Sequence, residues 1–141
     1  MTKLTSLIYA SKVTPGYLNS VEINKILAVA REKNKTKQLT GMLLCNLHYF
    51  LQILEGPKQI LSDTYSIIEQ DSRHQNVTKI SESITESRQF PDWQMGFYLF
   101  PKNKPDVLPE DWTLLSVSDA QWIFSRALNS CEGAGKAFYE L

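Results

Sequence analysis

The sequence predicts one α+β domain: a ferredoxin-like sheet with the element order β-α-β-β-α-β-β, two helices on one face, and a C-terminal helical extension. Three observations predict this fold. A chain of 141 residues has the size of one compact domain. Its hydrophobic content of 43% and charged content of 21% are typical of globular proteins. Strand-like and helix-like segments follow one another in the order of the split βαβ arrangement.

The first strand and the first helix open the chain. Thr5–Ser11 is apolar and β-favouring, and the turn residues at 14–16 end it. Asn19 or Ser20 can cap the helix that follows, because both side chains accept hydrogen bonds from a free helix N-terminus. Apolar residues then recur at the spacing of one helix face, so the helix is expected to reach about Asn34.

A hairpin and a second helix come next. Leu39–Cys45 and Tyr49–Glu55 are strand-like runs separated by three residues, a length that suits a hairpin. Gly56-Pro57 then starts a helix, with the proline expected at the first helical position. Leu61, Tyr65 and Ile68 mark the buried face of this helix.

Two more strands and a C-terminal helix complete the prediction. The pattern breaks at 71–75, and Val77–Thr85 and Trp93–Phe100 are strand-like. Residues 101–109 carry three prolines and three charges and are expected to form a loop. Ser118 and Gln121 have the spacing of a capping box for the last helix, whose apolar stripe would cover either the open sheet face or another subunit.

The charges argue against nucleic acid as the main partner, because 15 basic and 15 acidic residues cancel. They are unevenly placed, with eight basic against three acidic residues in 1–60 and seven against twelve in 61–141. The densest basic stretch consists of Arg31, Lys33, Lys35 and Lys37. It is interpreted as a solvated helix end whose cations interact favourably with the helix dipole. A binding site for the phosphate of a ligand is the more specific alternative.

Other classes of site are expected to be absent. No apolar run approaches the roughly 18 residues that cross a bilayer, and no export signal is evident, so a cytoplasmic protein is expected. His48 and His74, the only histidines, lack the spacing of a metal-ligand pair. The glycines at 133 and 135 do not form a phosphate loop, and no GxGxxG motif occurs. We therefore expect neither a metal ion nor an enzyme.

Three polar residues lie within segments that otherwise have the pattern of a core. Tyr9 is in the middle of the first strand, and Gln52 lies between Phe50 and Leu54 on one face of its strand. Asn34 is eight residues after Ile26, on the same side of the first helix. Each alone is most simply a core or capping residue with satisfied hydrogen bonds. Together they indicate an apolar slot with polar groups on its floor and rim, which suits a flat heteroaromatic ligand.

The motifs along residues 4–100 resemble those of BLUF domains, blue-light sensors that bind a flavin, usually FAD, without a covalent bond. They are Ser6–Ser11, Asn34 with Leu39-Thr40-Gly41, Phe50–Gly56, Asp71–His74, and Arg88-Gln89-Phe90 with Trp93-Gln94-Met95. The resemblance implies a photosensory domain over 1–100, followed by a loop and helical extension over 101–141 as in short single-domain members. It implies FAD as cofactor, with FMN and riboflavin as alternatives.

The resemblance also implies roles for individual residues. The isoalloxazine ring would lie between the two helices, sandwiched by Ile26 and Ile68. Asn34 would bond its pyrimidine edge, and Gln52 would reach its N5/O4 side while lying close to Tyr9. The polar periphery of the ring would be fixed by two residues at the end of the second helix, Arg73 and His74. Lys33 and Gln89 depart from residues that are common in the family.

A light-driven mechanism follows from that resemblance. Tyr9 would give up an electron and then a proton, and the amide of Gln52 would change its hydrogen bonds by rotation or tautomerisation. Trp93 and Met95, on one face of the last strand, would compete for the place near Gln52 and relay the signal. The expected output is an altered contact with an unknown downstream signalling protein, in a homo-oligomer. The alternatives are a flavin-free interaction module and a flavin-dependent oxidoreductase, which no nicotinamide motif supports.

Overall fold

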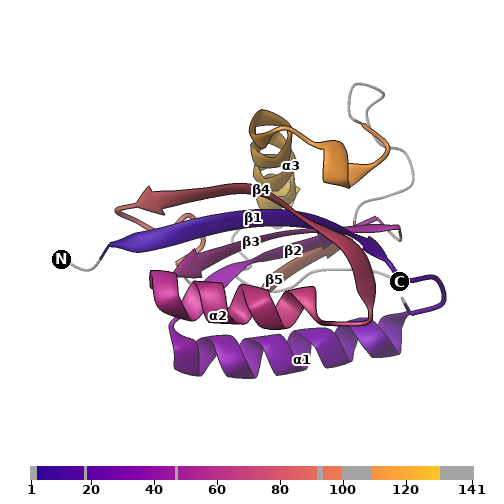
Figure 1. Ribbon diagram of the computed structural model, residues 1–141, viewed down its shortest axis with the longest axis horizontal. Helices are drawn as coiled ribbons and strands as arrows, with labels where there is room; N and C mark the ends of the chain where they lie inside the picture. The colour runs from indigo at the N-terminus through magenta and orange to yellow at the C-terminus, as the bar shows by residue number, and fades with distance from the viewer. Residues whose placement is uncertain (1–2, 18, 47, 92–93, 100–108, 131–141) are drawn as a thin grey trace.

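The computed structural model describes residues 3–17, 19–46, 48–91, 94–99 and 109–130 of the chain. The elements form a five-stranded sheet with helices on both sides (Figure 1). They are β1 (Leu4–Val13), α1 (Ser20–Lys37), β2 (Thr40–Cys45), β3 (Tyr49–Gly56), α2 (Lys58–Glu69), β4 (His74–Thr85), β5 (Gly96–Leu99), a 3₁₀ turn (Trp112–Leu114) and α3 (Val117–Ser130).

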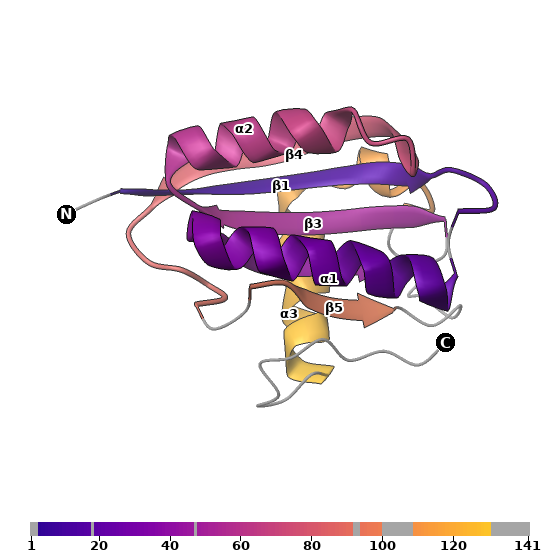
Figure 2. The same cartoon turned by 90° about the horizontal axis from the view of Figure 1, so that it is seen from below.

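The strand order is β4-β1-β3-β2-β5, and every neighbouring pair is antiparallel except β2 and β5. This is the split βαβ sheet of a ferredoxin-like fold with one strand added beside β2. Helices α1 and α2 lie side by side on one face, and α3 crosses the other (Figures 1 and 2). The predicted fold class is therefore confirmed. Of the two surfaces that the last helix was expected to cover, α3 covers the open face of the sheet.

Side chains of the strands alternate between two hydrophobic clusters, one on each face of the sheet. The front cluster packs under α1 and α2 and includes Leu7, Tyr9, Leu43 and Phe97. The back cluster packs under α3 and includes Ile8, Ala10, Leu44, Leu51, Ile53, Phe90 and Phe124. Gly41 is needed between the strands, because a Cβ there would lie 2.0 Å from the carbonyl oxygen of Ile53.

The start of α1 agrees with the sequence, and its end lies three residues later than expected. Asn19 is the N-cap, and its side chain accepts a hydrogen bond from the Glu22 amide at 2.9 Å. The helix continues through Lys37 and ends where Gln38 adopts a left-handed conformation with φ of 59°. Pro57 is the N-cap of α2 rather than its first helical residue.

Three further local predictions were wrong. The fourth strand begins at His74 rather than Val77, because the backbone of His74 pairs with Val13 of β1. Met95 precedes the last strand, which starts at Gly96. The capping box of α3 is formed by Ser116 and Asp119 instead of Ser118 and Gln121: the Asp119 amide donates to Ser116 Oγ at 3.1 Å, and the Ser116 amide donates to Asp119 Oδ2 at 3.3 Å. Among the described helices, none combines the length and the apolar character that crossing a bilayer requires.

Candidate functional site

A cavity of about 160 Å³ opens between α1 and α2 above the front face of the sheet. It is smaller than the roughly 300–1,000 Å³ of pockets that enclose a whole drug-sized ligand, so it suits a ring system whose remainder extends to the mouth. The seven residues predicted to bind a cofactor all line it: Tyr9, Ile26, Asn34, Gln52, Ile68, Arg73 and His74.

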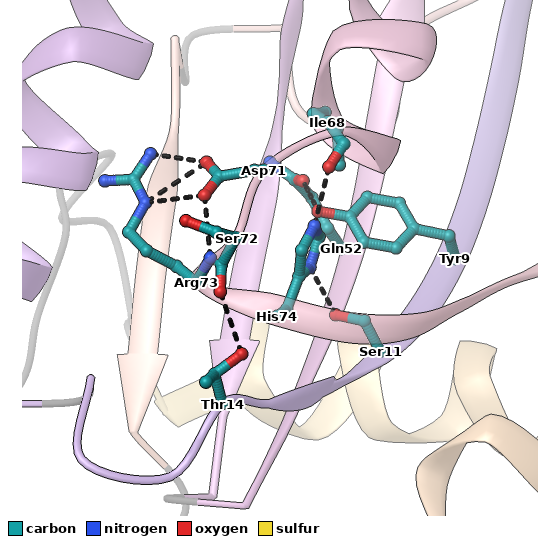
Figure 3. A network of polar contacts seen from close by, with 9 residues as sticks. All are labelled: Tyr9, Ser11, Thr14, Gln52, Ile68, Asp71, Ser72, Arg73 and His74. Atoms are coloured by element: carbon teal, nitrogen blue, oxygen red, sulfur yellow. Dashed lines mark hydrogen bonds and ion pairs between the residues drawn. The ribbon is translucent and has the colours of Figure 1, made fainter.

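The floor of the cavity is a buried phenol and amide in direct contact. Tyr9 and Gln52 are cross-strand partners in β1 and β3, so their side chains leave the sheet on the same face. The Tyr9 hydroxyl donates to Oε1 of Gln52, and only 3% and 6% of the two residues is exposed (Figure 3). Burial raises the pKa of Tyr9 far above its usual value, so the phenol keeps its proton and remains a donor.

The other end of the Gln52 amide faces the segment before β5. Its Nε2 donates to Sδ of Met95 at 3.3 Å, and Met95 is 3% exposed. The Gln52 side chain therefore accepts a hydrogen bond from Tyr9 through its oxygen and donates one to Met95 through its nitrogen. Of the two predicted relay residues, Met95 occupies the place beside Gln52, while Trp93 lies outside the described residues.

The walls of the cavity are apolar and come from both helices. Ile26 of α1 and Ile68 of α2 are half-buried and line the cavity from different helices, as a sandwich around a flat ring would require. Phe50 and Leu54 flank Gln52 two residues away on the same face of β3 and line the cavity as well.

One end of the Asn34 amide is hydrogen-bonded to the backbone just before β5. Its Nδ2 donates to the carbonyl oxygen of Gln94 at 2.7 Å, and the residue is 4% exposed. In the described part of the chain its Oδ1 receives no hydrogen bond. This oxygen is thus the group that could accept from an N–H of a bound heterocycle.

The remaining predicted residues meet at the start of β4 (Figure 3). Arg73 Nη2 lies 2.5 Å from Oδ2 of Asp71, and Nε bonds both Asp71 oxygens. A side-chain hydrogen bond from Arg73 holds the pKa of the Asp71 carboxyl below its usual range. Arg73 Nη1 bonds no other described residue, so it can donate to a ligand.

His74 is already bonded through both ring nitrogens. Nε2 lies 2.6 Å from the carbonyl oxygen of Ile68 and must donate to it, because a carbonyl only accepts. In the neutral ring Nδ1 then accepts from Oγ of Ser11 at 2.7 Å. A polar bond from His74 to a ligand would require one of these bonds to break. The ring instead ties α2 to β1 and packs edge-on against Tyr9, with ring centroids 6.1 Å apart.

Sequence reasoning missed two contributors. Thr64 lies four residues before Ile68 on α2, a spacing that places both on one helix face and could have revealed it. Its hydroxyl is buried and has no hydrogen-bond partner among the described residues. Arg31 was considered only as part of a basic stretch, but its Nε donates to the carbonyl oxygen of Met95 at 3.0 Å. No sequence pattern indicates a bond between residues 64 positions apart.

The donor set of the cavity fits a flavin. A flavin ring is flat, apolar on its faces and at one end, and carries N–H and C=O groups at the other. The cavity offers apolar walls, an open acceptor on Asn34, an open donor on Arg73 and an unpartnered hydroxyl on Thr64. The described residues contain no cluster of His, Cys, Asp or Glu that could hold a metal ion.

Two curated relatives match this chain over part of their own length. The photoactivated adenylate cyclase subunit beta of Euglena gracilis is 34% identical over 118 residues, which are 84% of this chain and 12% of that protein. The blue light- and temperature-regulated antirepressor BluF of Escherichia coli is 33% identical over 87 residues, which are 62% of this chain and 21% of that protein. This chain thus spans less than a quarter of either relative.

Solved structures give the same fold. The dark-state structure of BlrB, a BLUF protein, superposes with a TM-score of 0.65 at 33% identity and covers 69% of this chain and 73% of that one. BlsA in its ground state superposes with a TM-score of 0.78 over 88% of this chain and 87% of its own. Because BlsA is only 20% identical, it supports the fold alone.

The family assignment rests on a model that covers most of the chain. The model described as "BLUF: Sensors of blue-light using FAD" matches residues 4–96, which hold β1 to β4 and every residue that lines the cavity. The family is one of sensors rather than enzymes, and the alternative of a flavin-free interaction module is not favoured. The chain belongs to the BLUF family, and blue-light sensing with a bound flavin is the function of this domain.

Proposed function

We propose that the bonds of Gln52 are the light-sensitive element of this domain. One observation carries the proposal: a single buried amide accepts from Tyr9 and donates to Met95 at the floor of the cavity. A change in that amide therefore changes two protein contacts at once.

The chemistry of the site divides between cofactor and chain. A bound flavin supplies absorption of blue light and, once excited, a strong one-electron oxidant. Tyr9 would give one electron to the excited flavin and its phenolic proton to Oε1 of Gln52, to which its hydroxyl is already hydrogen-bonded. If the Gln52 amide rotates, its oxygen faces Met95 Sδ in place of the N–H, and the bond to Met95 is lost. Tautomerisation of the amide also alters what it offers on both sides.

The remaining cavity residues hold the ring. Ile26 and Ile68 would pack against it from the two helices, and Oδ1 of Asn34 would accept a hydrogen bond from one of its N–H groups. Arg73 contributes its open Nη1, and His74 fixes the wall between α2 and β1. The exposed Lys33 and half-buried Lys37 line the mouth, where they suit the phosphates of FAD or FMN.

The output is a change in protein contacts made by a photosensory domain over 1–100 and an extension over 101–141. The names of the Euglena and E. coli relatives refer to a cyclase and an antirepressor, which supports a downstream signalling protein as the partner here. Trp112 and Phe124 are buried in the back cluster, while Trp122 of α3 is 40% exposed, which supports a homo-oligomer that assembles through α3. A cytoplasmic location stays a prediction.

Absorption spectroscopy tests the proposal. The purified protein should be yellow, and blue light should produce a red shift of the flavin band that reverses in darkness. Tyr9→Phe should bind flavin and show no red shift, because the variant keeps the ring packing and lacks the hydroxyl. A full photocycle in Tyr9→Phe would overturn the mechanism. Size-exclusion chromatography in light and darkness, with a pull-down from lit and dark lysates, tests the oligomer and the partner.

A further inference from the structure

The segment Gln94–Met95, directly before β5, is held by three side chains. Asn34 Nδ2 donates to the Gln94 carbonyl at 2.7 Å, and Arg31 Nε donates to the Met95 carbonyl at 3.0 Å. Gln52 Nε2 donates to Met95 Sδ at 3.3 Å. Two of these three bonds come from α1 and do not depend on the Gln52 amide.

The two α1 residues differ in their relation to the cavity. Arg31 and Asn34 are three positions apart and therefore lie on one face of the helix. Asn34 lines the cavity, whereas Arg31 does not. An effect of Arg31 on the photocycle must therefore act through the segment it binds rather than through direct contact with the ring.

The chain is also anchored just before this segment. The buried carboxylate of Glu55 accepts hydrogen bonds from the backbone amides of Gln89 at 2.6 Å and Phe90 at 2.9 Å. Because residues 89 and 90 are fixed to β3, a movement of Gln94–Met95 has to be local. The α1 bonds are what oppose such a movement when Gln52 no longer donates to Met95.

We propose that Arg31 is a positioning residue that holds Gln94–Met95 in the dark arrangement and thereby shortens the lifetime of the lit state. The proposal rests on the proposed function of Gln52. Light removes one of the three bonds, and the segment shifts against the other two. Return to darkness requires the Met95 sulfur to come back to Gln52, and the Arg31 bond fixes the backbone position from which it does so.

The central variant is Arg31→Met, which keeps an apolar stem and removes the donor. Dark recovery of the flavin band should slow about tenfold, the ratio that corresponds to one hydrogen bond of ~1.4 kcal/mol. The size of the red shift should not change, because Arg31 does not line the cavity. Arg31→Lys, which keeps a donor and a charge, should lie between Arg31→Met and the original protein. Lys35→Gln is the matched control: it removes an exposed cation from the same helix and should recover at the original rate.

Amide hydrogen exchange in darkness tests, without photochemistry, whether Arg31 holds the segment Gln94–Met95. Exchange over 94–99 should rise about tenfold in Arg31→Met and stay unchanged in β1 and β3. Original recovery rate and original exchange in Arg31→Met would overturn the proposal, as would faster exchange spread over all of α1, which indicates a general loss of stability. If Arg31→Met fails to fold, Arg31→Gln decides by the same two measurements. If the original protein had no photocycle while Arg31→Met showed faster exchange over 94–99, the proposed function would be refuted. The hold of Arg31 on Gln94–Met95 would still be supported.

Discussion

The two faces of the sheet differ in what they bury, although the same strands build both. Along β3, Leu51 and Ile53 point into the back cluster. Gln52, which lies between them in the sequence, points to the opposite face and into the cavity. The back cluster is made entirely of apolar and aromatic side chains. The front face adds the buried polar side chains of Tyr9, Gln52 and Asn34.

That difference shows which face is built for stability and which for a ligand. An amide or phenol in an apolar interior costs free energy unless it is hydrogen-bonded. The front face keeps such groups together around a cavity. On the back face the buried Glu55, on the same side of β3 as Leu51 and Ile53, lines no cavity and is bonded to the Gln89 and Phe90 amides and to Thr40. We therefore expect substitutions in front to change photochemistry more than stability, and substitutions behind to do the reverse.

The largest expected effect is complete loss of the light response in Gln52→Leu. Leucine occupies a similar volume but offers neither the acceptor used by Tyr9 nor the donor used by Met95. Flavin should remain bound, and the free energy of unfolding should fall by about 1–3 kcal/mol, because the Tyr9 hydroxyl loses its partner. The light-minus-dark spectrum measures the first effect and denaturant unfolding the second. A red shift of normal size in Gln52→Leu would show that another group is the light-sensitive element.

The opposite pattern is expected for Phe124→Ala on the back face. Phe124 is 1% exposed and packs edge to face against Phe90, with ring centroids 6.3 Å apart. Its removal leaves a cavity and should lower the free energy of unfolding by about 3–5 kcal/mol. The protein that remains folded should keep its flavin and its red shift. A photocycle lost together with only a small change in stability would contradict the division between the two faces.

Most of the fold was predictable because it depends on local patterns. Strand alternation, helical spacing and the Asn19 cap are properties of neighbouring residues, and they give the element order and the cap of α1. The polar floor was also predictable, since Gln52 interrupts the apolar series of Phe50 and Leu54 on one face. The same alternation places Leu51 and Ile53 on the other face.

What the sequence did not reveal depends on partners far along the chain. The bond from Arg31 to Met95 spans 64 positions and has no local signature. His74 was assigned to a helix end because only its pairing with Val13 identifies it as part of a strand. The capping pattern alone did not choose between Ser116 and Ser118, because each is followed three residues later by a side chain that can complete a capping box.

A smaller effect is expected from Tyr9 at alkaline pH. Burial raises the pKa of Tyr9 far above its usual value, whereas in the unfolded chain the phenol titrates near its ordinary value of about 10. Below that pH both states hold the proton and Tyr9 adds no pH dependence. Above it only the unfolded state releases the proton, so the free energy of unfolding falls with rising pH, by up to ~1.4 kcal/mol per pH unit.

The variant Tyr9→Phe isolates this contribution, because the other tyrosines stay in place. Its free energy of unfolding should fall less steeply than that of the original protein above about pH 10, and the two slopes should agree between about pH 7 and 9. Urea unfolding at each pH supplies the measurement. Parallel curves through the alkaline range would mean that Tyr9 ionises in the folded protein as readily as in the unfolded chain.

The smallest expected effect concerns the mouth of the front cavity. Lys33 and Lys37 are one helical turn apart, both line the cavity, and neither forms an ion pair with a described residue. The double variant Lys33→Gln/Lys37→Gln should bind FAD about threefold to tenfold more weakly at low ionic strength and bind riboflavin unchanged, because only FAD carries phosphates. Fluorescence titration of the flavin-free protein gives both affinities, with exposed Lys35→Gln as the control. If these lysines serve only the negative end of the α1 dipole, the double variant should lose stability without distinguishing the two flavins. Added salt is a second test. If the lysines contact phosphate, high salt should abolish the loss of FAD affinity that the double variant shows at low salt, because salt screens charge interactions at the surface.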